Sequence, residues 1–144
     1  MREKEQKLWD VVRKRLPVSI MMAERIENAV GTGGPDVRTL CRGTHRAIEL
    51  KAVDALPKRA TTRVLGDDGV SIAQKNWWLD YTKHGGVGVI LIGIGGGTSR
   101  EFIAVGGEHA DAVNGWCIQE LRCAHHGNGT QFWFEFMDYL GAKP

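Results

Sequence analysis

The sequence predicts an α/β fold in which a mixed central sheet is flanked by helices. Two segments, near residues 3–16 and 71–84, have the features of helices. Short apolar runs bounded by glycines lie between and after them, and such runs are typical of strands. Because helices and strands alternate along the chain, we expect the helices to pack on the faces of one sheet.

The first helix is expected over residues 3–16. Apolar residues recur there at the i, i+3, i+4 spacing of a single helical face, and Pro17 ends the pattern. These residues are Leu8, Val11, Val12 and Leu16. The mixed stretch at 18–30 is expected to end in a strand near Arg25–Val30.

A hairpin is expected in the next part of the chain. The glycine-rich turn at 31–35 precedes a strand at Val37–Leu40. The segment 42–45 is typical of a hairpin turn, and 46–52 is the returning strand. A polar loop at 54–70 follows it.

A capping box predicts where the second helix begins. In Ser71-x-x-Gln74 the serine side chain can accept from the amide of Gln74, whose own side chain can reach back to Ser71. Gly85-Gly86 is a suitable end for this helix.

The rest of the chain is expected to add two strands and two helices. The strongly apolar run 87–94 predicts a buried strand, and 95–99 turns into a strand at 101–105. A third helix is expected over about 109–124. The tail at 131–140 fits either a strand or a helix by its apolar spacing, and we favour the helix.

Composition indicates one ordinary globular domain over residues 1–144. The chain is 42% hydrophobic and 25% charged, and it has no apolar run long enough for a membrane helix. No signal-peptide pattern begins it, and three cysteines suit a reducing compartment, so we expect a cytoplasmic protein, or one in the host cytoplasm if a phage encodes it.

The charge of the chain is unevenly distributed, although the net charge is only +2. Residues 1–63 hold 14 Lys and Arg against 8 Asp and Glu, whereas residues 64–144 hold 5 against 9. A basic half could face nucleic acid, or folding could mix the two halves.

One group of residues has the composition of a phosphodiesterase metal site. Side chains alternate across a strand, so Glu49 and Lys51 share one face while Ile48 and Leu50 face the core. Asp36 follows the glycine-rich turn and can join Glu49 from the neighbouring strand. Two carboxylates and the backbone carbonyl of Leu50 are oxygen ligands of the kind that Mg²⁺ prefers. Lys51 could orient the attacking water or stabilise the transition state.

These residues resemble the PD-(D/E)XK nuclease superfamily. The resemblance rests on Glu24-Arg25-Ile26-Glu27-Asn28-Ala29-Val30 with Gly34-Pro35-Asp36, then on Ile48-Glu49-Leu50-Lys51, and on Gln74-x-x-Trp77. Within the superfamily the chain looks most like small phage and bacterial nucleases of the VRR-NUC and Holliday-junction-resolvase-like type. The resemblance covers about residues 5–94 and leaves 95–144 as a C-terminal extension.

The resemblance implies a restriction-endonuclease-like core and a Mg²⁺-dependent DNA endonuclease, for which branched or structured DNA is a candidate substrate. Mn²⁺ would substitute for Mg²⁺, and a homodimer would place two sites on two strands. By the motif, Asp36 and Glu49 are metal ligands, Lys51 is the catalytic lysine and Gln74 lies near them. An additional acidic ligand would come from Glu27 or from its rival Glu5.

Other readings of the same residues remain open. Glu49 and Lys51 could be a surface pair, and Gln74 could be only a helix cap. The cations Lys58, Arg59 and Arg63 could contact phosphates or belong to a solvated loop. The whole chain could instead be a non-catalytic nucleic-acid-binding module, or a small-molecule-binding protein that uses its glycine loop.

Two further patterns have a simpler explanation. The glycines at 93–97 could cradle a phosphate only if they opened a helix, and here we expect a hairpin turn. The group Cys117, Cys123, His125 and His126 lacks a Cys-x-x-Cys pair, which disfavours zinc. Trp77 and Trp78 are expected to pack in the core and at its rim.

Overall fold

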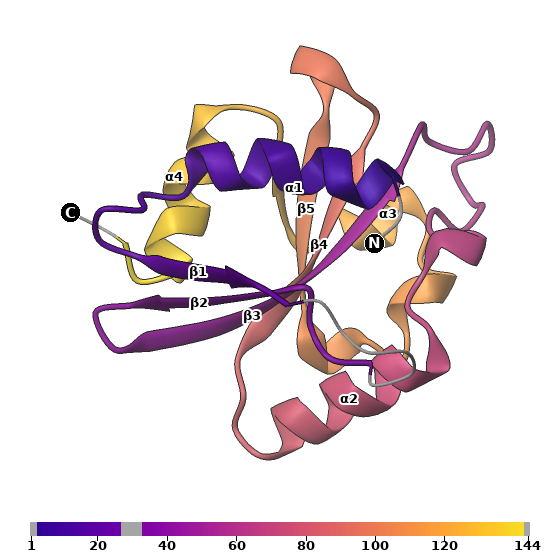
Figure 1. Ribbon diagram of the computed structural model, residues 1–144. Helices are drawn as coiled ribbons and strands as arrows, with labels where there is room; N and C mark the ends of the chain where they lie inside the picture. Colours follow the sequence, from indigo (N-terminus) through magenta and orange to yellow (C-terminus); the bar gives the residue numbers. More distant parts are fainter. Residues whose placement is uncertain (1–2, 27–32, 143–144) are drawn as a thin grey trace.

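The computed structural model describes residues 3–26 and 33–142, which build one six-stranded sheet with the order β1-β2-β3-β4-β5-β6 (Figure 1). Only β3 and β4 pair in parallel, and every other neighbouring pair is antiparallel. The expected mixed sheet flanked by helices is therefore confirmed. The strands are β1 (Met22–Arg25), β2 (Val37–Cys41), β3 (Thr44–Val53), β4 (Gly88–Ile94), β5 (Glu101–Gly106) and β6 (His125–Gly127).

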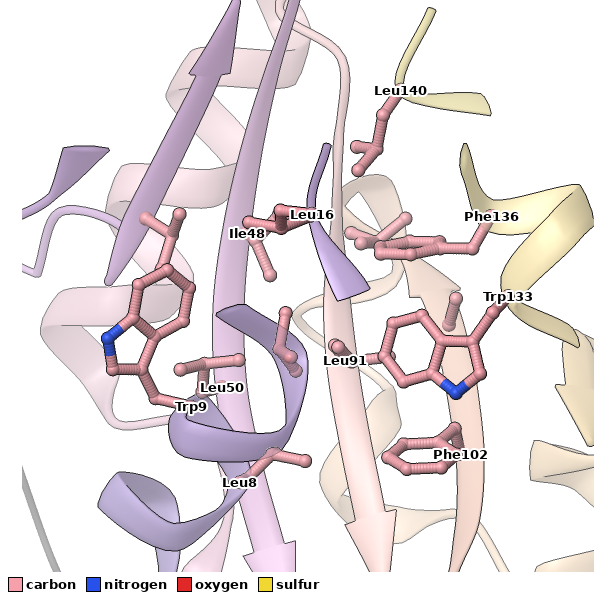
Figure 2. Packing of buried hydrophobic residues seen from close by; sticks show 14 of the residues in the cluster. Leu8, Trp9, Leu16, Ile48, Leu50, Leu91, Phe102, Trp133, Phe136 and Leu140 are labelled. Atoms are coloured by element: carbon pink, nitrogen blue, oxygen red, sulfur yellow. The ribbon is translucent and has the colours of Figure 1, made fainter. Parts of the chain in front are cut away.

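Helices cover both faces of the sheet. The helices α1 (Glu3–Arg15) and α4 (Thr130–Tyr139) pack on one face, where Figure 2 shows Leu8 and Trp9 of α1 beside Leu50. On the same face Trp133 and Phe136 of α4 lie near Leu91 and Phe102 (Figure 2). The other face is covered by α2 (Ile72–Lys83) and the short α3 (Ile118–Leu121). Within the described ranges, no helix has the length and apolar character needed to cross a membrane.

The hairpin of β2 and β3 sets the position of the candidate site. Its two-residue turn, Arg42-Gly43, has positive φ angles of 51° and 82°, the twist that suits tight hairpins. The register pairs Val37, the first residue of β2, with Ile48, so the last five residues of β3 extend beyond β2. From Glu49 onward, β3 is paired only with β4 on its other side.

The expected hairpin between β4 and β5 is confirmed. All seven residues of β4 are buried, and the chain reverses through a short 3-10 turn, Gly97–Ser99, into antiparallel β5. The glycines at 93–97 therefore join two strands and do not open an α-helix.

Three sequence predictions need correction or completion. A continuous helix over 109–124 is wrong: 3-10 turns at Gly107–His109 and Val113–Gly115 precede the four-residue α3. The cause lies in Asn114, whose side chain accepts from the Val70 amide at 2.7 Å and donates to its carbonyl at 2.8 Å. Strand β6 was not predicted.

The first strand also differs from the expectation. It occupies Met22–Arg25, earlier than the expected Arg25–Val30, and residues 27–32 lie outside the described part of the chain. The helix favoured for the tail is confirmed as α4, with Phe132, Trp133 and Phe136 buried.

Candidate active site

Asp36 lies at the open edge of β3, just before β2 begins. Its amide donates to the carbonyl of Ile48 at 3.0 Å. Its carboxylate accepts from the amide of Leu50 at 2.8 Å, where a longer β2 would have continued the ladder. The N–H and C=O of one strand residue point to the same side, so the carbonyl of Leu50 also faces this edge. The side chain of Asp36 thus replaces a strand partner and is fixed against the backbone of β3.

The backbone of Gly33 lies close against the backbone of α2. Gly33 has a φ of +70°, and a Cβ at this position would collide with the backbone of Ala73 in the first turn of α2. Only glycine combines this conformation with this contact. Gly33, three residues before Asp36, therefore lies directly beside the helix that carries Gln74.

Glu49 is buried between the sheet and α2, with 1% of its surface exposed. Its Oε2 accepts from Nε2 of Gln74 at 3.1 Å, and its Oε1 accepts from Nε1 of Trp78 at 3.4 Å. Because the two donors lie four residues apart, they project from the same side of α2. Both oxygens of the carboxylate are held by one helix.

Trp78 is a site residue that sequence reasoning assigned to packing alone. Its ring is fully buried and fits so closely against Gly107 that a Cβ there would overlap it. The spacing from Gln74 to Trp78 is the signal that could have identified it, since i and i+4 residues share a helix face.

The pKa of Glu49 is raised to about 10, first because burial penalises the charged carboxylate. A hydrogen bond with Asp36 and the negative charge of Asp36 raise it further, whereas Lys51 and Trp78 lower it. The two carboxyl groups are thus close enough to share a proton. A buried carboxyl group such as that of Glu49 needs a proton or a cation between itself and a neighbouring carboxyl group to be stable.

Lys51 is also buried, with 6% exposure. At the edge of β3 it contacts both α1 and α2. Its Nζ donates to Oε1 of Gln74 at 3.0 Å and lies 3.8 Å from Oε1 of Glu5 on α1. Glu49 and Lys51 share a face as expected. That face is not a surface, because α2 covers it.

Gln74 is both a capping-box residue of α2 and a neighbour of the candidate site residues, as the sequence suggested. Its Oε1 accepts from the amide of Ser71 at 2.9 Å while its own amide donates to Oγ of Ser71 at 3.1 Å, which confirms the capping box. The same oxygen accepts a hydrogen bond from Nζ of Lys51, and Nε2 donates one to Glu49. The cap of α2 therefore also orients the two ionisable side chains of β3, Glu49 and Lys51.

The structure brings Asp36, Glu49, Lys51 and Gln74 together, and it adds Glu5 beside Lys51. Glu27, the other candidate for an additional acidic ligand, lies outside the described residues.

The donor set fits a hard divalent cation such as Mg²⁺. Asp36 and Glu49 offer carboxylate oxygens that interact with each other, and Mg²⁺ is commonly held by one or two carboxylates with several waters. A cation between them would offset the repulsion that raises the pKa of Glu49. Across residues 3–26 and 33–142, no group of three or more His, Cys, Asp or Glu could hold a metal ion.

The cysteine and histidine residues near the C-terminus have other contacts. Nδ1 of His125 lies 3.3 Å from Glu135, and Nδ1 of His126 lies 3.7 Å from Glu101. Cys117 precedes α3, and Cys123 is exposed.

Comparison with known proteins gives a distant structural similarity. No protein-family model matches the chain, and no curated protein matches it. Among solved structures, the chain is similar to Hjc of Archaeoglobus fulgidus, a Holliday junction resolvase from an archaeal hyperthermophile. The TM-score is 0.45 and the identity 17%, over 69% of this chain and 74% of that one. A similarity of this size assigns neither a function nor site residues to the chain.

Proposed function

We propose that residues 1–144 form a single-domain, Mg²⁺-dependent DNA endonuclease of the PD-(D/E)XK type. One observation carries the proposal: two carboxylates and a lysine converge at the edge of β3, where Gln74 holds Glu49 and Lys51 and the amide of Leu50 holds Asp36. The buried carboxyl group of Glu49, next to Asp36 and the buried Lys51, is costly to maintain, and such strongly perturbed groups are typical of functional sites.

The residues would divide the work as follows. Asp36, Glu49 and the carbonyl of Leu50 would hold the cation, and Glu5 or Glu27 would add a further carboxylate. When bound, Mg²⁺ supplies Lewis acidity toward the phosphodiester and compensates its negative charge. Lys51 places a positive charge beside the carboxyl pair, where it orients the attacking water or stabilises charge in the transition state. Gln74 positions Lys51 and Glu49 relative to each other.

Branched DNA is the substrate that the sequence resemblance suggests. A homodimer would present two such sites to two strands of one junction. Mn²⁺ is expected to replace Mg²⁺, because it accepts the same oxygen ligands.

A panel of substrates and metals tests this function. The protein is incubated with linear, nicked, branched and single-stranded DNA in Mg²⁺, Mn²⁺ or EDTA. We expect cleavage in both metals and none in EDTA, with the highest rate on branched DNA. Cleavage that persists in EDTA would contradict the proposal. Binding of all substrates without any cleavage would favour the non-catalytic binding module.

A further inference from the structure

We propose that the loop at 54–63 binds the DNA backbone beside the cleaved bond through Lys58, Arg59 and Arg63. This inference rests on the proposed function and names the surface that would receive its substrate. The loop leaves the end of β3, three residues after Lys51, and Figure 1 shows it projecting from the body of the sheet.

Both ends of the loop are fixed. The carbonyl of Val53, at the end of β3, accepts from the amide of Gly95 at 3.0 Å. At the other end, the amide of Val64 donates to the carbonyl of Trp116 at 3.0 Å, and both Val64 and Leu65 are buried. Between these anchors the amide of Thr62 closes a turn onto the carbonyl of Arg59 at 3.1 Å. The loop is thus anchored to the rest of the fold by backbone hydrogen bonds at both ends.

Packing does not explain this segment. All its side chains from residue 54 to residue 63 are exposed, apart from a partly buried Pro57. A ten-residue excursion that buries almost nothing contributes little to the stability of the fold. Long loops of this kind are more often functional when a rigid scaffold holds them next to a site.

The three cations of the loop are available to a ligand. Across residues 3–26 and 33–142, none of Lys58, Arg59 and Arg63 has an ion pair or a side-chain hydrogen bond. The nearby acids Asp54 and Asp68 pair with Lys4, whose Nζ lies 3.3 Å from Asp68 and 3.8 Å from Asp54. Three exposed positive charges without acidic partners favour an anionic ligand.

Continuity with the candidate site favours the DNA backbone as that ligand. Lys58 lies seven positions after Lys51, and a chain extends by at most roughly 3.5 Å per residue, so the two lie within roughly 25 Å of each other. At 3.4 Å per step along one strand, that distance spans about seven phosphates. A strand whose scissile phosphate lies at Lys51 would therefore pass within reach of the loop.

Salt dependence of binding tests the inference with a matched pair of variants. The double variant Lys58→Ala/Arg59→Ala removes two loop charges. Its control, Lys14→Ala/Lys83→Ala, removes two exposed charges from the last turns of α1 and α2, away from the site. The dissociation constant for a DNA duplex is measured in EDTA across a range of KCl concentrations, and thermal unfolding confirms that each variant is folded.

Each phosphate contact contributes about 0.9 to the slope of log K against log salt. We expect the magnitude of this slope to fall by about 1.8 in the loop variant, which loses two contacts, and to keep the parental value in the control. Adding Arg63→Ala should lower the slope by about 0.9 more. Equal slopes for parent, control and loop variants would overturn the loop assignment.

The outcome also separates this inference from the proposed function. A parent protein that cleaves DNA in Mg²⁺, with loop variants of unchanged slope, would overturn the loop and leave the nuclease intact. A parent that neither cleaves DNA nor binds it in a salt-dependent manner would overturn both.

Discussion

The side-chain oxygen of Gln74 accepts hydrogen bonds from Lys51 Nζ at 3.0 Å and from the Ser71 amide at 2.9 Å. One atom therefore joins the cap of α2 to the proposed catalytic lysine. Ser71→Ala should cost about 1 kcal/mol of unfolding free energy, the usual loss for a cap, and leave cleavage near the parental rate. Gln74→Ala should lower stability by a similar amount and also slow cleavage by roughly 10-fold or more.

Urea unfolding and single-turnover cleavage separate the two effects. If both variants cleave at the parental rate, Gln74 acts only as a helix cap.

Trp78→Phe should weaken metal binding while keeping the core filled. Phenylalanine retains an aromatic ring but removes the Nε1 donor that lies 3.4 Å from Glu49. That hydrogen bond lowers the pKa of Glu49, so its loss should make the carboxylate harder to ionise. We expect a several-fold higher Mg²⁺ concentration for half-maximal cleavage. Trp77→Phe is the matched control, because the Trp77 ring stacks on Tyr81 and no hydrogen bond joins it to Glu49 in the described structure. Equal metal dependence of the two variants would show that Trp78 only packs.

The stability of the metal-free protein should fall as the pH rises from about 4.5. The pKa of Glu49 is raised to about 10 in the folded state from 4.5, so between these values the unfolded chain has lost a proton that the folded protein keeps. The unfolding free energy then decreases with pH, by at most about 1.4 kcal/mol per pH unit. Glu49→Gln should remove this dependence and be more stable than the parent at pH 8 in EDTA.

Thermal unfolding in EDTA between pH 4 and pH 9 measures the effect. At pH 4 the parent and Glu49→Gln should be close in stability, because Glu49 is protonated in both states of the parent. A parent whose stability rises from pH 5 to pH 8, relative to Glu49→Gln, would contradict the assignment.

Glu5 and Glu27 can be separated as sources of the additional carboxylate. Oε1 of Glu5 lies 3.8 Å from Nζ of Lys51, so Glu5 lies beside the proposed catalytic lysine. We expect Glu5→Gln to lower the cleavage rate by about 10-fold and Glu27→Gln to leave it near the parental value. The opposite ranking would assign the role to Glu27. Circular dichroism of both variants provides the control for folding.

Local patterns predicted the elements around the site well. The alternation at 47–51 depends only on strand geometry, and the burial of Ile48 and Leu50 on one face agrees with it. The capping box of Ser71 and Gln74 is likewise a contact within four residues, so the sequence contains it completely.

Contacts between distant segments could not be predicted in the same way. The hydrogen bond of Trp78 to Glu49 depends on how α2 lies across β3, a relation of residues 29 apart. The expected helix over 109–124 failed for a similar reason, since the Asn114 side chain is bonded to Val70, 44 residues away. The three-residue strand β6 is too short for its own periodicity to reveal it.

The rate of DNA cleavage in Mg²⁺ by the parent, Asp36→Asn and Lys51→Ala tests the central claim most directly. Asp36 and Lys51 meet the other site residues through hydrogen bonds at 2.8 Å and 3.0 Å, and both would act on the reacting phosphate or its metal. Under single-turnover conditions with branched DNA, we predict losses of at least about 100-fold for each variant, with folding retained. Full parental rates in both variants would contradict the account.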